Sequence, residues 1–377
     1  MSVHVASVGM GRFGKRPEGL VALAAEAAHL ALEGVGRKPI DLLIVGSMFA
    51  QGPYGREALL PRLAAVLGLE AASGFRVDSS SGTGGMAFHA AVLALETGRF
   101  ERALVVGAEK MTDRPTAEIT KDLAASLHMS EVAVGATMPA LAALVTSRYL
   151  ERYQFSASIC DVATVHARAM AARNPNAHFQ KPVTLEEVAG SKPVALPLRL
   201  LHCSAISDGA TAVVLEKGKG PATVLGLGQG FDALRIVDRE DLTSFAATRV
   251  AARRAYEEAH LTRKEVNVLE VHDAFSPFAM MHLEDLGMCG PGEGPTWFEK
   301  DWVGLNGRLP VNPSGGVVGR GHPVAASGLA EIAEVTLQLR GEAGAHAIGT
   351  APKVGLAQTI SGIGSHNFVT LLGKEAP

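Results

Sequence analysis

Short runs of β-branched and aliphatic residues alternate along the chain with longer stretches rich in alanine and leucine. Near the N-terminus this pattern predicts a strand over residues 3–9, an amphipathic helix over 17–33 and a second strand over 40–49. Such an alternation is typical of a sheet with parallel strands that is covered by helices. We therefore expect an α/β fold.

The first half continues with predicted strands over 74–78 and 103–107, with a glycine turn and a helix between them. After an interruption, residues 208–216 read as one more strand of the same half. We therefore assign residues 1–111 and 202–221 to the first half of the fold.

The interruption covers residues 112–201. Here helical pieces, among them 138–153 and 158–172, are joined by polar turns, and the strand pattern is lost. We interpret this segment as a loop domain that forms a cap over the first half.

Residues 222–377 repeat the plan of the first half. Strands are predicted at 222–228, 266–271, 354–360 and 368–372, and helices at 243–260, 275–286 and 323–340. In each half a glycine-rich turn opens a long helix, at residues 81–85 and at residues 319–322. The pattern predicts a duplicated fold in which the N-termini of two helices face one cleft.

Composition narrows the class of protein. The chain has 377 residues, 47% of them hydrophobic, and a net charge of -3, which gives no reason to expect nucleic acid or an anionic membrane as partner. No apolar run reaches the roughly 18–20 residues that span a bilayer, and the N-terminus does not resemble a signal peptide. Three scattered cysteines are too few for a disulfide framework or a metal knuckle. We expect a cytoplasmic enzyme without a metal site.

A cluster of serines and glycines, residues 78–84 (DSSSGTG), stands where a predicted strand passes into a helix. A side chain at such a turn is held at a helix N-terminus, which is the placement used for exposed nucleophiles. The same residues also serve as an ordinary N-cap, and spacing alone does not decide between the two readings.

A second cluster, residues 270–275 (EVHDAF), places His272 at the end of a predicted strand. A helix cap by Asp273 beside a merely exposed histidine would give the same pattern. In a third cluster, residues 319–323 (GRGHP), His322 stands between glycine and proline at a helix start. That position fixes the orientation of the ring, as a catalytic imidazole requires.

Longer blocks around these clusters resemble the thiolase family. Residues 309–316 and 321–328 are similar to its Gly-His-Pro block. Residues 272–275 are similar to the His-Asp-x-Phe block of the sterol-carrier-protein type and of archaeal acetyl-CoA acetyltransferases. Further blocks match at residues 107–111, 174–179 and 200–210, so the resemblance extends from about residue 5 to residue 373.

This resemblance implies the thiolase fold, a duplicated five-layered αβαβα architecture with an inserted loop domain, usually in a homodimer. It also implies an enzyme of lipid metabolism that takes acyl-CoA as substrate and needs no other cofactor.

The family's functional residues can be carried over position by position. His322 is similar to the imidazole that activates the nucleophile and helps to bind the thioester oxygen. His272 stands where a family side chain fixes a water in the same oxyanion hole. The backbone N–H groups of Ser81 and Gly362 match the second oxyanion hole, a type of site that commonly supplies several kcal/mol. The substrate-binding positions are Asn312, Gly321 and Ser327.

The chain departs from the family at the nucleophile, because Ser81 falls on the position of the reactive cysteine. A thiol with an ordinary pKa of about 8.5 ionises readily at a helix N-terminus, whereas a serine hydroxyl needs a general base. His322 could be that base, although no orienting carboxylate is evident. Ile360 and Ala274 also stand where relatives have cysteine. Thiolysis should therefore be slow or absent.

Three functions remain open at this point. The first is a thiolase-like acyl-CoA C-acyltransferase with an attenuated reaction at Ser81. The second is an acyl-CoA retro-aldolase that works with a small OB-fold/zinc-ribbon partner. Two histidines and an oxyanion hole suffice for such enolate chemistry. Related aldolases rely on tyrosines in the cleft, whereas this chain keeps the histidines His272 and His322, which weakens the aldolase interpretation. The third is a non-catalytic acyl-CoA-binding scaffold.

Overall fold

The computed structural model describes residues 2–36, 38–49 and 58–374. The first half consists of β1 (Val3–Met10), α1 (Leu20–Glu33), β2 (Leu42–Gly46), α2 (Leu59–Leu67), β3 (Ser73–Val77), α3 (Thr83–Glu96), β4 (Arg102–Glu109) and β7 (Gly209–Lys217). The second half consists of β8 (Thr223–Phe231), α9 (Ala246–Ala259), β9 (Val268–Val271), α10 (Pro277–Asp285), α11 (Gly294–Glu299), α12 (Gly316–Arg320), α13 (Val324–Arg340), β10 (Val354–Ser361) and β11 (His366–Gly373). In the described part of the chain, no helix is long and apolar enough to cross a membrane.

The strands form one nine-stranded sheet in the order β3-β2-β4-β7-β1-β8-β11-β10-β9. In the first half, β2 is parallel to β3 and β4, and β7 is antiparallel to both β4 and β1. The second half repeats this order. There β9 is parallel to β10 and to a bridge at Val311, and β11 is antiparallel to both β10 and β8. The duplication expected from the sequence is thus visible in strand order and direction.

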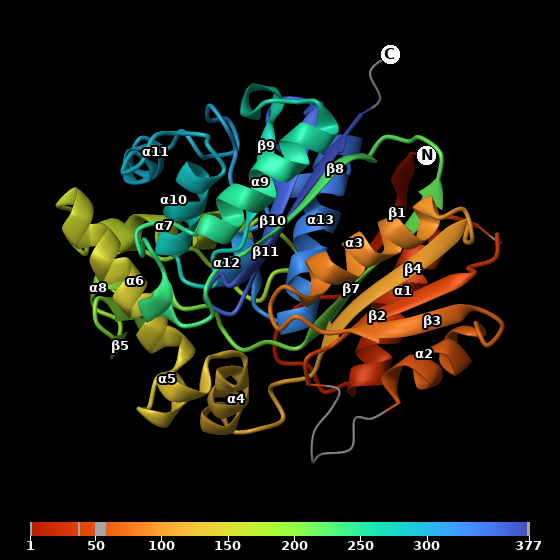
Figure 1. Ribbon diagram of the computed structural model, residues 1–377, viewed down its shortest axis with the longest axis horizontal. Coiled ribbons are helices and arrows are strands. Elements are labelled where there is room, and N and C mark those ends of the chain that lie inside the picture. Colours follow the sequence, from red (N-terminus) through yellow and green to blue (C-terminus); the bar gives the residue numbers. More distant parts are fainter. Residues whose placement is uncertain (1, 37, 50–57, 375–377) are drawn as a thin grey trace.

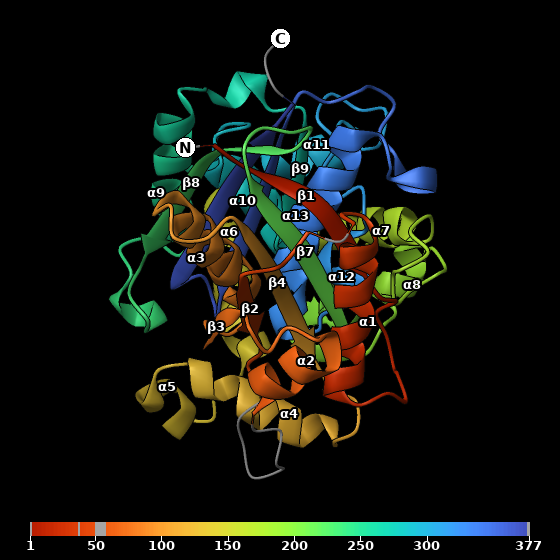
Figure 2. The ribbon, with the colours of Figure 1, turned by 90° about the vertical axis from the view of Figure 1, so that its right-hand side faces the viewer.

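The halves meet where β1 pairs with β8 at His4 and Thr223. Helices α3 and α13 lie between them and share one apolar core with both half-sheets (Figures 1 and 2). Because alternate side chains of a strand point to opposite faces, Ile44 joins this central core while Leu43 and Val45 pack outward against α1 and α2. On the other side, α9 and α10 cover the outer face of the second half. The five layers are therefore helix, sheet, helix, sheet, helix.

The segment between the halves contains α4 (Thr116–Leu123), α5 (Met129–Ala133), α6 (Met138–Tyr153), α7 (Ile159–Ala171), α8 (Leu185–Ala189), β5 (Pro193–Ala195) and β6 (Leu198–Arg199). The sequence predicts a cap over the first half, but α6 and α7 pack mainly against α10 and α12 of the second half. Small residues explain this close approach, since a Cβ at Gly319 would lie 2.5 Å from the backbone oxygen of Ala167.

Most predicted elements agree with the structure to within a few residues, but α2 and α11 were not predicted, and the turn before His322 differs as well. Residues 319 and 320, predicted as turn, belong to the short helix α12. The carboxylate of Asp273 accepts hydrogen bonds from the backbone N–H groups of Val317 and Val318 and thereby caps this helix. The turn is reduced to Gly321 and His322.

Candidate active site

Ser81 lies in a tight turn between β3 and α3. Asp78 holds this turn, because its Oδ1 accepts hydrogen bonds from the Ser80 N–H at 2.9 Å and the Thr83 hydroxyl at 3.3 Å. Ser80 has the left-handed φ of +51°, an uncommon conformation for a residue with a side chain. The turn places Ser81 two residues before the first residue of α3, at the positive end of the helix dipole.

The hydroxyl of Ser81 makes no hydrogen bond with any described residue, although the residue is only 7% exposed. Its neighbour Ser80 instead donates a hydrogen bond to the hydroxyl of Ser126 at 3.3 Å. Ser126 is the last residue of the 3-10 turn η1 (Ala124–Ser126) in the cap. The dyad of Ser81 with His322 considered from the sequence is therefore not formed in this state of the protein.

His322 is held in place through its backbone and its ring. Its N–H donates to the hydroxyl of Ser207 at 3.2 Å, and its ring Nδ1 lies 2.8 Å from the hydroxyl of Ser327. Gly321 has a φ of +102°, and a Cβ at this position would lie 2.7 Å from the Ser207 hydroxyl. Only glycine fits there, which gives the predicted Gly321 a steric role before the histidine.

His272 stands at the end of β9 and is completely buried, so the alternative of a merely exposed histidine is wrong. Its Nδ1 lies 2.7 Å from Oε1 of Glu331 on α13, and its backbone N–H donates to Gln358 at 3.1 Å. The other ring nitrogen, Nε2, is buried without a hydrogen-bond partner among the described residues. A buried polar atom without a partner marks a position that a ligand atom or a water can occupy.

The rings of His272 and His322 face each other edge to face, with centroids 5.1 Å apart. Burial, together with the nearby Arg320 guanidinium, lowers the pKa of His272 to about 3. The pKa of His322 is also well below its usual value, through burial and then through His272 and Arg320. Both imidazoles are therefore neutral at pH 7.

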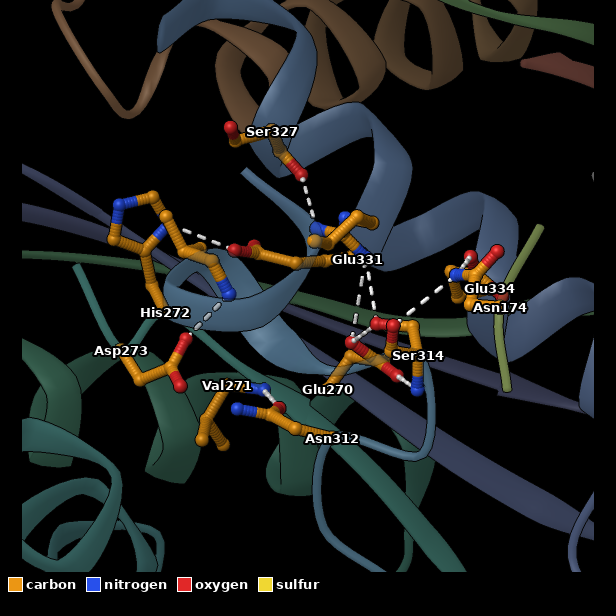
Figure 3. A network of polar contacts seen from close by, with 12 residues as sticks. Asn174, Glu270, Val271, His272, Asp273, Asn312, Ser314, Ser327, Glu331 and Glu334 are labelled. Carbon is orange, nitrogen blue, oxygen red and sulfur yellow. Dashed lines mark hydrogen bonds and ion pairs between the residues drawn. The ribbon is translucent and has the colours of Figure 1, made fainter. Parts of the chain in front are cut away.

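A network of buried charged and polar groups connects the end of β9 with α13 (Figure 3). The fully buried guanidinium of Arg320 donates to the hydroxyl of Ser314 at 2.9 Å and lies 3.5 Å from Glu270. It also donates to the backbone oxygen of Ser327 at 3.3 Å. Two turns further along α13, Glu334 pairs with His346 at 2.8 Å. Removing one member of such a buried network leaves an uncompensated charge, which is costly.

Asn312 is buried beside His272, with its side chain turned to the backbone. Its side-chain Oδ1 accepts a hydrogen bond from the backbone N–H of Val271 at 2.7 Å. The backbone N–H of Asn312 donates to the backbone oxygen of Leu269 at 2.8 Å. These bonds fix the end of β9 just before His272. A direct contact of Asn312, Gly321 or Ser327 with substrate stays a prediction.

The predicted backbone donors both lie near Ser126 of the cap segment η1, Ser81 through its neighbour Ser80. Gly362 has a φ of +58° in the turn between β10 and β11, and a Cβ on it would lie 3.6 Å from the backbone oxygen of Ser126. Neither its N–H nor that of Ser81 takes part in a hydrogen bond within the described residues. Both groups are therefore free to bind an oxyanion, the role that the resemblance gives them.

Glu331 was missed in the sequence, although α13 contained a signal. All but two of the 17 residues of this helix are buried, and two of the buried ones are the carboxyl side chains Glu331 and Glu334. Buried carboxyl groups need partners, so both pointed to groups on neighbouring elements.

Within the described residues, no group of three or more His, Cys, Asp or Glu side chains is arranged to hold a metal ion. Two neutral imidazoles and free backbone N–H groups, one before α3 and one in the β10–β11 turn, are suited to a different task. They can stabilise negative charge on a carbonyl oxygen and move a proton near it. The fold thus defines a class of α/β proteins built from two similar halves, with a site whose groups suit a carbonyl ligand.

The family can be stated from sequence comparison. Residues 3–197 match the family model described as "Thiolase, N-terminal domain", and residues 228–374 match "Thiolase C-terminal domain-like". The chain belongs to the thiolase family.

Two curated relatives and one solved structure illustrate the similarity. The chain is 37% identical over 360 residues to an acetyl-CoA acetyltransferase of Methanothermobacter thermautotrophicus, with 93% of both chains covered. It is 30% identical to human sterol carrier protein 2, and the matched region covers 100% of this chain and 72% of that protein. The solved Ltp2-ChsH2(DUF35) aldolase has the same fold, with a TM-score of 0.83 and 24% identity over 99% of this chain and 98% of that one.

Proposed function

We propose that this protein is an acyl-CoA C-acyltransferase of the thiolase type in which Ser81 stands in place of the nucleophilic cysteine and thiolysis is attenuated. The observation that supports this proposal most is the pair of neutral imidazoles of His272 and His322, 5.1 Å apart. The helix that follows Ser81 packs directly on α13, since a Cβ at Gly84 would lie 2.2 Å from the backbone nitrogen of Leu329.

The proposed chemistry needs few groups. The thioester oxygen accepts hydrogen bonds in the cleft, and charge that develops on it is stabilised by donors already in place. His322 takes the proton of the attacking Ser81 hydroxyl or of CoA. An oxygen nucleophile is less readily ionised than a thiolate, so acyl transfer through Ser81 is slower than through cysteine.

The decisive assay is thiolysis of acetoacetyl-CoA with CoA, followed by formation of acetyl-CoA. We expect a low rate for the natural chain, at least about a tenfold higher rate for Ser81→Cys because a thiolate forms readily at a helix N-terminus, and no thiolysis for Ser81→Ala. Equal rates for all three variants would refute the proposal that acyl transfer passes through residue 81.

A second candidate is an acyl-CoA retro-aldolase that works with a small OB-fold/zinc-ribbon partner. The observation that favours it is the Ser81 hydroxyl, which lacks a base within hydrogen-bond distance among the described residues while both histidines are retained. Cleavage of a 3-hydroxyacyl-CoA to an acyl-CoA and an aldehyde or ketone tests it. Retained cleavage in Ser81→Ala would support the retro-aldolase, and acyl-CoA binding without any turnover would support the scaffold.

We further propose a homodimer that forms through β3. Among the described residues this strand is the last in the sheet, so one side of its backbone has no strand partner there, and Phe75 on it is 40% exposed. Light scattering on the protein eluted from a size-exclusion column should give twice the chain mass. The substitution Phe75→Asp should reduce this measured mass. The matched control is Leu144→Asp in the cap, at a position that is 55% exposed and far from β3 in sequence. A monomeric natural chain would refute the dimer.

A further inference from the structure

The two histidines of the site are held by partners of different chemical kinds. Nδ1 of His322 lies 2.8 Å from the Ser327 hydroxyl, whereas Nδ1 of His272 lies 2.7 Å from the Glu331 carboxyl. Ser327 and Glu331 are four residues apart on α13, so one face of this helix carries both partners (Figure 3). One helix therefore determines the state of both rings.

Counting protons fixes the tautomer of His322. The Ser327 hydroxyl has a single hydrogen, which it donates to the carbonyl oxygen of Pro323 at 3.0 Å. Its contact with His322 at 2.8 Å must then be a hydrogen bond from the ring N–H at Nδ1. Nε2 of His322 is left with its lone pair and can act as a base.

The same count gives a different result for His272. The Thr359 hydroxyl donates to Oε2 of Glu331, so an acid proton on this carboxyl lies on Oε1, between it and Nδ1 of the ring. If the pair holds that proton, Nε2 carries a hydrogen whether the proton sits on Oε1 or on Nδ1. If the pair loses it, Nδ1–H donates to the carboxylate and Nε2 is bare.

Burial keeps this proton on the pair near neutral pH. It raises the pKa of Glu331 to about 8 against the opposing effects of Arg320 and Thr359, and it lowers the pKa of His272 to about 3. The charged or titratable groups nearest the pair are Arg320 of α12, His282 of α10 and His322 before α13. Below about pH 8 the Nε2–H of His272 is therefore present, and above it that hydrogen is lost.

We propose that Glu331 is the positioning residue that makes His272 a hydrogen-bond donor to the thioester oxygen, while Ser327 keeps His322 as the base. In the step that forms the enolate, Nε2 of His322 takes a proton from the α-carbon of the acyl group. The C–H electron pair forms the C=C bond of the enolate, and the carbonyl π pair moves to the oxygen that His272 holds. This assignment rests on the proposed acyl-CoA chemistry but is independent of the nucleophile at residue 81.

Deuterium uptake into the α-carbon of acetyl-CoA in D2O isolates this step. For the natural chain we expect kcat/KM of exchange to be level near pH 7 and to fall as the pH rises through about 8. Glu331→Gln can donate from its amide to Nδ1, so it should retain exchange within about tenfold and lose the alkaline decline. Glu331→Leu should lose about 10²-fold at pH 7, as for removal of one oxyanion donor.

The matched control is Glu334→Gln, one turn further on the same helix and paired with His346 instead of a site histidine. It should keep the alkaline decline, whatever its effect on stability. A decline that persists unchanged in Glu331→Gln would overturn the assignment.

Nitrogen NMR of the protein labelled with ¹⁵N-histidine gives a readout that needs no turnover. With His272→Asn identifying the signals, Nε2 of His272 should be protonated at pH 7 and Nε2 of His322 unprotonated. A bare Nε2 on His272 at pH 7 would refute the role of Glu331 even in an active enzyme. The expected tautomers without deuterium exchange in the natural chain would refute the proposed acyl-CoA chemistry and leave the role of Glu331 standing.

Discussion

Ser81 and His322 occupy corresponding places in the two halves of the molecule, and their surroundings differ. Each stands two residues before the first residue of an inner helix, α3 or α13. The backbone and ring of His322 are each held by a serine hydroxyl, whereas the Ser81 side chain has no hydrogen-bond partner among the described residues.

This difference indicates how the work of the site is divided. The second half supplies side chains in a fixed orientation and the backbone N–H of Gly362, whereas the first half supplies a helix N-terminus and the backbone N–H of Ser81. Preorganisation of this kind is what stabilises charge in a transition state. The site is therefore most sensitive to changes in the second half.

The largest effect is expected for His322→Ala. We predict a loss of at least about 10³-fold in turnover, for thiolysis or for retro-aldol cleavage, because both need the base and general bases contribute 10²–10⁴-fold. Binding of acyl-CoA, measured by calorimetry, should change far less. The control His29→Ala lies exposed on α1. Full activity of His322→Ala would contradict the placement of the site.

Ser327→Ala should have an intermediate effect. It removes the acceptor of the His322 ring N–H and frees the ring to adopt the other tautomer, so we expect about a tenfold lower kcat with little change in KM. Loss of the buried hydrogen bonds should also reduce the free energy of unfolding by about 1–2 kcal/mol. Ser327→Thr keeps the hydroxyl and should restore most of the rate. If Ser327→Ala and Ser327→Thr have equal kcat values, the hydroxyl does not set the tautomer.

Many helices and strands of the fold can be predicted from the sequence, because the spacing of apolar residues that identifies them involves residues close together in the chain. Helix α6 was expected at residues 138–153, the bounds that it has. The packing of α7 on α12 was not predicted, since it depends on the contact of Gly319 with Ala167 across a long separation in the chain.

The polar contacts of the site were harder to predict than its elements. Motifs indicated His272 and His322, but the pairing of His272 with Glu331 joins residues 59 positions apart. A spacing rule covers partners on one element, such as Ser327 and Glu331 on a helix. It does not cover partners that only the packed fold brings together.

The smallest effect is expected for the stability of Ser81→Ala, and this variant tests the comparison most directly. Because the Ser81 hydroxyl has no hydrogen-bond partner in the described structure, its removal should change the free energy of unfolding by less than about 0.5 kcal/mol. The helix start does not depend on that side chain, since Asp78 and Thr83 hold the turn. Denaturant unfolding measures the free energy of unfolding of Ser81→Ala and of Asp78→Ala. We expect Asp78→Ala to lower it by about 1 kcal/mol or more, because the turn at the helix start loses the carboxylate that holds it. A large loss in Ser81→Ala would mean that the hydroxyl supports the fold, and the contrast between the two halves would then be wrong.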